Sequence, residues 1–488
     1  MHLIGNAHYG FFRDELYFII CGRHPAWGYV DQPPLTPLIA AGTQLFGTSL
    51  FWLRAAAALC AAGGVFVSLR LVQQLRGGAF AQILTGICVA LAPVLLSFGM
   101  KVSTDMLGLW LWPLAALYVA RLIDGADARW WLAVGTAIGV AGEAKYSVLF
   151  FAIALIVGVA ASPSRRVFAT WWSVAAAAIA MSIVLPNFVW QAVHGFPMLE
   201  LLRNGQHGKN VVLSPLAYVA EEILIFNPAL SLVWIAGLIY ASIVARLRWI
   251  AATMMVLVAL MIAFHAKHYY PADAYPMLFA AGALALEAWT ARARFVRPVI
   301  AVAALALAAA LVPVELPVMS VEHFQAYAKR LSQVLHIGSK TAASEHHRLG
   351  RLPQDYADMQ GWPEMVAVVA RTYDALPPAR RARAAIVADN YGEAAAIDFF
   401  GGRYGLPPTL SGHNQYWLWG THGYDGSTIV KVGGDAADRF GAMFASVRLA
   451  TRFQNPWGMP FEDNLPIYVL EGARHPLTSY WPLLRAYN

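Results

Sequence analysis

Charge is scarce in this sequence. Asp, Glu, Lys and Arg make up 13% of the 488 residues, whereas an ordinary soluble domain carries about 25%. Hydrophobic residues make up 59%, and the net charge is +7. The basic residues stand in short clusters between apolar runs, which is typical of the loops of membrane proteins. A nucleic-acid binder would instead gather them on one face, so we expect membrane lipids as the surroundings and no nucleic acid as a partner.

Several kinds of site have little support. Only three cysteines are present, and Cys60 and Cys88 lie inside apolar runs, so neither a disulfide framework nor a zinc knuckle is predicted. The chain has no Walker loop, and its glycine pairs suit helix packing or turns better than a nucleotide site. His265 and His268, at i and i+3, can share a helix face. A divalent metal held by them and a carboxylate is left open, and no other cofactor is predicted.

Apolar runs long enough to cross a bilayer, which takes about 20 residues, are abundant. We predict about ten spans in a polytopic α-helical membrane protein. They are Leu50–Leu75, Phe80–Phe98, Thr104–Leu122, Trp130–Ala141, Tyr146–Ala161, Ala169–Trp190, Asn227–Ala245, Trp249–His265, Ala274–Trp289 and Pro298–Val314. The fourth and fifth runs are short and flank "GEAKYS". They are therefore either two passes or one long bent helix.

The charges of the connections help to choose between these two topologies. Every second connection is basic: Arg76; Arg121 and Arg129; Arg165 and Arg166; Arg246 and Arg248; Arg292, Arg294 and Arg297. Basic loops stay in the cytoplasm, so the connections between them face outward. Two short passes keep this alternation in register and one bent helix breaks it, so we predict two passes. The segments before Leu50 and after Val314 then lie outside.

That topology raises a question about the first residues. Residues 1–34 contain neither a span nor a signal peptide that would carry this segment outward. Either a helix precedes the present start, or the N-terminus crosses together with the first hairpin. We favour the preceding helix.

After Val314 the sequence changes to dispersed charge, Gly and Pro punctuation and short alternating patterns. These patterns predict strands at "RARAAIVADN", "TIVKVGG" and "LPIYVLEG", and helices at "YGEAAAIDFFG" and "AADRFGAMFA". We therefore expect three parts: an outward first loop with an interfacial helix over 1–49, a transmembrane domain over 50–314, and an extracytoplasmic α/β domain over 320–488.

The stretch "FFRDELYFIICGRHPAWGYVDQPPLTPL" combines charge with aromatic residues before the first long apolar run. Asp14 and Glu15 point about 100° apart on a helix, so one can act while the other is held by a structural partner. An acidic, solvated helix start is the plain alternative. The many aromatic residues suit a membrane interface and favour a functional loop. The following "LTPLIAAGTQLFG" is too short to span and reads as an interfacial helix.

The other outward loops also carry ionisable and polar side chains. We take these as candidate substrate-binding residues: Asp31, Lys101, Asp105, Lys145, Lys267, His268 and Tyr270. Each could be an end cap that reaches toward water, but together they predict one outward cleft. Cations there would absorb the charge of a lipid-phosphate leaving group. A carboxylate, with Asp14 and Glu15 as the candidates, would act as catalytic base toward an acceptor hydroxyl.

At these residues the sequence resembles a known family. "FFRDELYFIICGRHPAWGYVDQPPL" is similar to the first outer loop of bacterial polyprenyl-phosphate-dependent glycosyltransferases of the GT-C fold. They include protein O-mannosyltransferase-like enzymes, lipid A aminoarabinose transferases and lipopolysaccharide galacturonosyl transferases. The resemblance continues through "AKYSVLF", "LPNFVWQAVHGFPMLELLRN", "HYYPADAYPMLFAAGALALE" and "ADNYGEAAAIDFFGGRYGLPPTLSGHNQYWLWG", and so covers most of the chain.

The resemblance implies inverting transfer of a sugar from a polyprenyl-phosphate donor to an envelope lipid, glycan or protein. It also implies Asp14 as the base. Lys145, His268 and Tyr270, with Asp105, match positions that imply donor binding. One departure is Gln32, which stands where aminoarabinose transferases have a lysine. The expected location is the bacterial inner membrane, with the site and the C-terminal domain on the periplasmic side.

Two other classes of function remain open at this point. A transporter or flippase would also place charges between helices, but it more often shows inverted repeats and helices broken near the midplane. A non-catalytic assembly protein would use the C-terminal domain for docking. The glycosyltransferase interpretation requires that Asp14 face the same cleft as Lys145 and His268.

Overall fold

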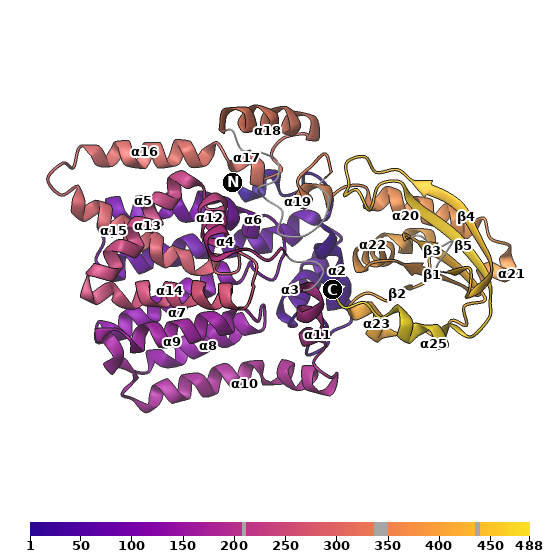
Figure 1. Ribbon diagram of the computed structural model, residues 1–488, viewed down its shortest axis with the longest axis horizontal. Coiled ribbons are helices and arrows are strands. Elements are labelled where there is room, and N and C mark those ends of the chain that lie inside the picture. The colour runs from indigo at the N-terminus through magenta and orange to yellow at the C-terminus, as the bar shows by residue number, and fades with distance from the viewer. Residues whose placement is uncertain (207–210, 336–349, 435–439) are drawn as a thin grey trace.

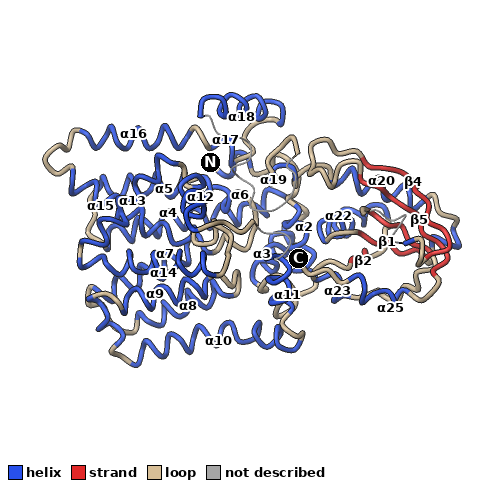
Figure 2. The backbone as a smooth tube through the Cα atoms, viewed as in Figure 1, coloured by secondary structure: helices blue, strands red, loops and turns tan. Residues whose placement is uncertain are grey.

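The computed structural model describes residues 1–206, 211–335, 350–434 and 440–488. Two parts follow one another along its long axis (Figure 1). Helices fill one part, and the described strands gather at the far end of the other (Figure 2). We call these the helical part and the sheet part, and we call the region between them the junction.

The helical part runs from the N-terminus to residue 335. Its helices are α1 (His2–Gly5), α2 (Arg13–Arg23), α3 (Leu35–Thr43), α4 (Leu50–Gln74), α5 (Ala79–Leu91), α6 (Pro93–Met100), α7 (Gly108–Ile123), α8 (Trp130–Gly142), α9 (Val148–Ala160), α10 (Trp171–Val193), α11 (Pro197–Asn204), α12 (Pro215–Ile225), α13 (Pro228–Ile243), α14 (Arg248–Ala263), α15 (Tyr275–Trp289), α16 (Val296–Ala309), α17 (Val312–Glu315) and α18 (Val321–Leu335). Side chains cap several of them. Ser49, for example, accepts a hydrogen bond from the Trp52 N–H at the start of α4.

Each predicted span corresponds to a helix or a bent pair of helices, but the count of ten spans is not confirmed. Among the described residues, four helices are long and apolar enough to cross a membrane, or up to six if each bent pair is one span. The four are Leu50–Gln74, Trp171–Val193, Ala245–Ala263 and Val296–Glu315. One bent pair, α5 and α6, turns by 59° at Pro93, which lacks the N–H needed to continue α5.

The segment around "GEAKYS" forms two helices. α8 and α9 lie side by side, with α8 packed against α10 and α9 against α14 (Figure 1). The segment is thus two separate helices and not one long bent helix. The long connection after α10 also contains structure that the sequence analysis did not predict, namely α11 and α12, and α12 meets α13 at 117°.

Basic connections meet at the end of the helical part that lies away from the sheet part. The Arg246 guanidinium binds the Asp124 carboxylate, and it also donates to the carbonyl oxygens of Gln74 and Leu75. Three connections are thus joined by one arginine. The other set of connections lies at the junction, as the alternation of loop charge predicts.

The sheet part holds α19 (Gln354–Ala357), α20 (Trp362–Asp374), α21 (Pro378–Arg381), α22 (Tyr391–Phe400), α23 (Gln415–Trp419) and α25 (Leu477–Tyr480). Its strands are β1 (Ala384–Ala388), β2 (Thr409–Ser411), β3 (Thr428–Val432), β4 (Phe444–Phe453) and β5 (Leu465–Ala473). The sheet order is β2-β1-β3-β5-β4. β1 pairs in parallel with β2 and β3, while β5 runs antiparallel to β3 and β4.

Both faces of the sheet are packed. Ile386 and Val430 face a core that includes α20 and α22 and continues into the helical part, whereas Ala385 and Ile429 face a second core with Leu477. Alternate residues of a strand point to opposite faces, which produces this division. The α/β character of the C-terminal region is therefore confirmed.

Four of the five elements that the sequence analysis predicted in the sheet part are correct, whereas elements such as α20, β2 and α23 were not predicted. β1, β3, β5 and α22 match predicted segments. The first four residues of the helix predicted at 436–445 lie outside the described residues. Residues 441–443 form a turn, and the last two residues begin β4. That strand was not predicted. α18, in the expected α/β region, lies beside the helical part next to α17 (Figure 1).

Candidate functional site

A cavity of about 1720 Å³ lies at the junction. All but one of the predicted site residues line it: Asp14, Asp31, Lys101, Asp105, Lys145, Lys267, His268 and Tyr270. They come from α2, from the loop after it, and from the connections that follow α6, α8 and α14. The fold thus brings widely separated loops to one place. The exception is Glu15.

Asp14 lies in the first turn of α2, where unpaired backbone N–H groups favour a negative charge. Its Oδ1 accepts a hydrogen bond of 2.7 Å from the Tyr391 hydroxyl. The Arg13 Nε lies 3.6 Å from the same oxygen, and the Asp14 side chain keeps 33% of its surface exposed. Asp14 is therefore a carboxylate fixed on one side and open to the cavity on the other.

Glu15 occupies the opposite environment. Its side chain is fully buried, and its Oε2 accepts hydrogen bonds from the Arg54 Nη2 at 3.0 Å and the Phe12 N–H at 2.9 Å. Its Oε1 accepts from the Val102 N–H at 3.1 Å. This carboxylate joins the first loop to α4 and to the connection after α6. It does not line the cavity, so the proposal below assigns the role of base to Asp14 alone.

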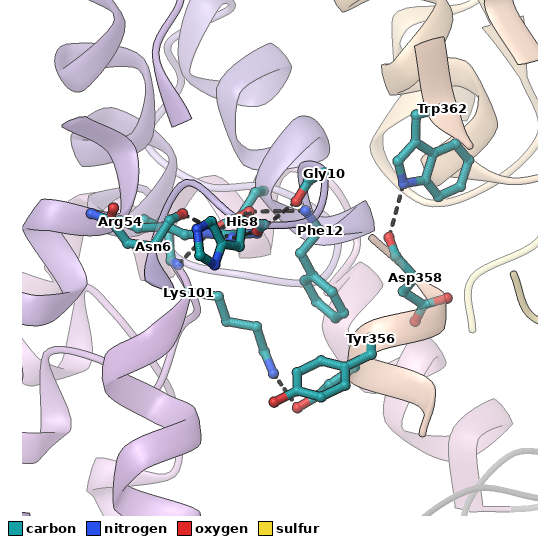
Figure 3. Close-up of polar contacts among 12 residues, drawn as sticks. Asn6, His8, Gly10, Phe12, Arg54, Lys101, Tyr356, Asp358 and Trp362 are labelled. Atoms are coloured by element: carbon teal, nitrogen blue, oxygen red, sulfur yellow. Dashed lines mark hydrogen bonds and ion pairs between the residues drawn. The ribbon is translucent and has the colours of Figure 1, made fainter. Parts of the chain in front are cut away.

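The sequence analysis missed Arg54, the partner of Glu15. This residue is fully buried near the start of α4. Its guanidinium also donates to the carbonyl oxygens of Asn6, His8 and Gly10 (Figure 3). One available signal was an arginine in the first turns of an apolar helix of 25 residues, because ionisable residues in such helices are costly unless they are paired.

Lys145 is a partly buried cation of the cavity. Its ammonium pairs with the Asp105 carboxylate and lies 4.0 Å from the centre of the Tyr270 ring. Burial opposes the charge, but Asp105 and the rings of Tyr270 and Tyr269 more than offset it, so the pKa of Lys145 is raised. The ammonium stays charged beside the open part of the cavity.

The two other predicted cations differ from Lys145 in their contacts. Lys101 pairs with Asp355 at the start of the sheet part and lies 4.8 Å from the centre of the Phe12 ring (Figure 3). Lys267 lies on the connection after α14, next to His268. Burial, followed by the charge of Lys267, lowers the pKa of His268 to about 4, so this imidazole is neutral at neutral pH.

Comparisons with known proteins agree with this architecture. A family model described as dolichyl-phosphate-mannose-protein mannosyltransferase matches residues 31–190. A lipid A galacturonosyltransferase, RgtD of Rhizobium johnstonii, is 26% identical over 186 residues, which is 38% of this chain and 39% of that relative. The chain therefore matches about two fifths of the length of this curated relative.

Solved structures cover nearly the whole chain. ArnT from Cupriavidus metallidurans bound to undecaprenyl phosphate superposes with a TM-score of 0.61 and 15% identity, covering 96% of this chain and 95% of ArnT. The chain shares the fold of ArnT. The apo form of ArnT gives a TM-score of 0.60. An oligosaccharyltransferase from Archaeoglobus fulgidus is more distant, with a TM-score of 0.50 over 87% of this chain and 64% of that one. The resemblance noted in the sequence is confirmed.

Within the ArnT-like fold, the arginine beside the candidate base is anchored by the sheet part. The Arg13 N–H donates to the Asp358 carbonyl oxygen, and its guanidinium lies 3.8 Å from the Asp358 carboxylate. Burial raises the pKa of Asp358 to about 6, although Arg13 acts to lower it. The charges of Asp14 and Asp355 raise it as well. Burial, followed by the charge of Asp358, raises the pKa of Glu462.

Metal binding has no support in the described part of the chain. No group of three His, Cys, Asp or Glu side chains there is arranged to hold a metal ion. His265 and His268 both line the cavity, but they do not form such a group with a carboxylate.

Proposed function

We propose that this protein is an inverting glycosyltransferase that moves a sugar from a polyprenyl-phosphate donor to a hydroxyl group of an envelope acceptor. The observation that carries the proposal is the cavity itself. It places an accessible carboxylate, Asp14, in one space with the ammonium of Lys145 and the neutral His268. A base and a cation for a leaving phosphate are the two groups that such a displacement needs.

The reaction follows from these groups. Asp14 takes the proton of the acceptor hydroxyl as the oxygen attacks the anomeric carbon from the side opposite the phosphate. The bond between that carbon and the phosphate oxygen breaks, and the phosphate leaves with its electron pair. Lys145, together with Lys101 and Lys267, stabilises the added negative charge. His268 and Tyr270 act as neutral groups that orient the donor, and Asp31 binds sugar or acceptor hydroxyls.

The relatives suggest the classes of substrate. Undecaprenyl phosphate is bound by ArnT, and RgtD is named for transfer of galacturonic acid to lipid A. We infer a polyprenyl monophosphate as the lipid carrier, and lipid A or an envelope glycan as the acceptor. The basic loops at the opposite end of the helical part support a bacterial inner-membrane location, with the cavity and the sheet part on the periplasmic side.

The position of the charges favours a transferase over a transporter. The predicted site residues lie at the junction, where the helical part meets the sheet part, and not halfway along the spans. A transporter site would be expected near the middle of the bilayer, between broken helices. A non-catalytic assembly protein would have no reason to gather Asp14, Lys145 and His268 in one cavity.

Direct turnover tests the proposal. Purified protein in detergent is mixed with polyprenyl-phosphate donors that carry radiolabelled sugars, and with lipid A or core glycan as acceptor. Release of polyprenyl phosphate together with label in the acceptor is the expected result. Mass spectrometry of lipid A, core glycans and glycoproteins from a deletion strain identifies the acceptor. Movement of intact donor across vesicles, without release of the sugar, would contradict the proposal.

The role of Lys145 leads to a specific prediction. We expect Lys145→Gln to weaken binding of the donor phosphate by about tenfold, because a charge-assisted hydrogen bond of 1.5 kcal/mol or more is lost. The measurement is the affinity for polyprenyl phosphate alone, in detergent, at two salt concentrations. Arg330→Gln, at an exposed arginine of α18 that does not line the cavity, is the matched control. Equal affinities in the two variants would contradict a phosphate contact at Lys145.

A further inference from the structure

The N-terminus of α22 lies directly against the N-terminus of α2. Asn390 precedes α22, and its Oδ1 accepts the Glu393 N–H at 2.9 Å, while the Glu393 Oε2 accepts the Asp389 N–H at 2.9 Å. These bonds fix the turn that starts α22. The first residue of α22, Tyr391, is 8% exposed and lines the cavity. The sheet part therefore places a rigid tyrosine at the predicted site.

Tyr391 contacts three residues of α2, namely Asp14, Tyr17 and Arg13. Its hydroxyl donates to the Asp14 Oδ1 at 2.7 Å, and its ring lies 4.6 Å from the Tyr17 ring, centre to centre. The Arg13 guanidinium lies 5.3 Å from the centre of the Tyr391 ring. A Cβ at Gly392 would come within 2.3 Å of the Arg13 Cγ, so the glycine leaves room for the arginine to pass. The local sequence thus permits this close approach.

Asp31, the other carboxylate of the first loop that lines the cavity, is held from the same side. The Tyr17 hydroxyl donates to the Asp31 Oδ1 at 2.9 Å, and the Asn414 Nδ2 donates to the Asp31 Oδ2 at 3.3 Å. Gln415 contributes twice, because its N–H donates to the Tyr17 hydroxyl and its Oε1 accepts the Val30 N–H. Two segments of the sheet part, at Tyr391 and at 414–415, therefore fix Asp14 and Asp31, the two cavity-lining carboxylates of a loop 377 and 383 residues earlier in the chain.

From this geometry we propose that the C-terminal sheet part completes the active site, with Tyr391 as the positioning residue for Asp14. The tyrosine hydroxyl holds Oδ1, and we assign Oδ2 to the proton of the acceptor. A hydrogen bond from a neutral donor favours the ionised form of a carboxylate, which is the form that acts as a base. Burial raises the pKa of Tyr391, so its hydroxyl keeps its proton and remains the donor.

This role rests on the proposed function, and it predicts a loss confined to turnover. Tyr391→Phe keeps the ring contacts with Tyr17 and Arg13 and removes only the hydroxyl. We expect kcat to fall about tenfold or more, the effect of losing a hydrogen bond to a charged group. The KM for the donor and the affinity for polyprenyl phosphate alone should be unchanged, because the donor phosphate is held by the lysines.

Tyr416→Phe is the matched control. Tyr416 is also a buried tyrosine of the sheet part, and its hydroxyl donates to the Asp398 carboxylate at 2.8 Å; neither of these two residues lines the cavity. The Tyr416 ring stacks on Tyr17, and phenylalanine keeps that contact. Each variant loses one buried hydrogen bond between a phenol and an aspartate. Thermal unfolding midpoints should fall by similar amounts in the two variants, whereas only Tyr391→Phe should lose kcat.

The possible outcomes separate this inference from the proposed function. Wild-type turnover with an unchanged kcat in Tyr391→Phe would overturn the positioning role alone. The same holds if the loss appears in the donor KM, or if Tyr391→Phe unfolds well below Tyr416→Phe, since Tyr391 would then serve donor binding or stability. A wild-type protein that releases no sugar from any polyprenyl-phosphate donor would overturn the proposed function, and this inference with it.

Discussion

Asp14→Asn is expected to abolish sugar transfer while the protein still inserts and folds. An amide cannot take the proton of the attacking hydroxyl, and general-base catalysis contributes about 10²–10⁴-fold to rates. The asparagine Oδ1 can still accept the hydrogen bond from Tyr391, and Asp14 is partly exposed. Little stability should therefore be lost. This is the largest change in activity that the geometry predicts for a single atom replacement.

Radiolabel transfer from the polyprenyl-phosphate donor measures this effect, with thermal unfolding as the check on folding. Asp374→Asn is a suitable control, because Asp374 is an exposed carboxylate of α20 that pairs with Arg381 on the surface. The control should turn over like wild type. Retained binding of polyprenyl phosphate by Asp14→Asn would place the defect after donor binding. Full turnover by Asp14→Asn would remove Asp14 from the mechanism.

Much of the cavity was predictable because the charges of the connections indicate which connections lie on the same side of the membrane. Lys145 and Asp105 are forty residues apart in the chain, yet both follow a predicted outward end of a span, and they form an ion pair. The same reasoning placed His268 and Asp14 at that end. Once every second connection is assigned to the cytoplasm, the other connections all lie at the opposite end of the helices, whatever the exact number of spans.

The contributions from the sheet part were not predictable in this way. Tyr391 and Asn414 bind Asp14 and Asp31 across more than 370 positions, and no local pattern encodes such a pairing. Their positions depend on how α22 docks on α2, which follows from the packing of the whole sheet. β4 was missed for a different reason. It is an edge strand whose central residues are largely exposed, so it lacks the alternation of apolar and polar residues that identifies a half-buried strand.

Arg54 and Glu15 lead to the largest predicted change in stability. We expect Glu15→Gln to lower the free energy of unfolding by about 3–5 kcal/mol, the usual cost of removing one partner of a buried ion pair. Both side chains are fully buried. The substitution keeps the shape of the side chain but removes its charge. It also brings an amide NH₂ next to groups that are all donors, namely Arg54 and the N–H groups of Phe12 and Val102.

Thermal unfolding in detergent measures this loss, and Glu471→Gln provides the contrast. Glu471 pairs with Arg380 on the exposed surface of the sheet part, where an ion pair contributes about 0–1 kcal/mol. If the two variants lose equal stability, the Glu15–Arg54 pair does not hold the first loop. If Glu15→Gln is selectively destabilised, its kcat should fall as well, because Glu15 joins the start of α2 to the connection that carries Lys101 and Asp105. Of the two adjacent acids of the first loop, Glu15 would then have the structural role, paired with Arg54, and Asp14 would be left as the base.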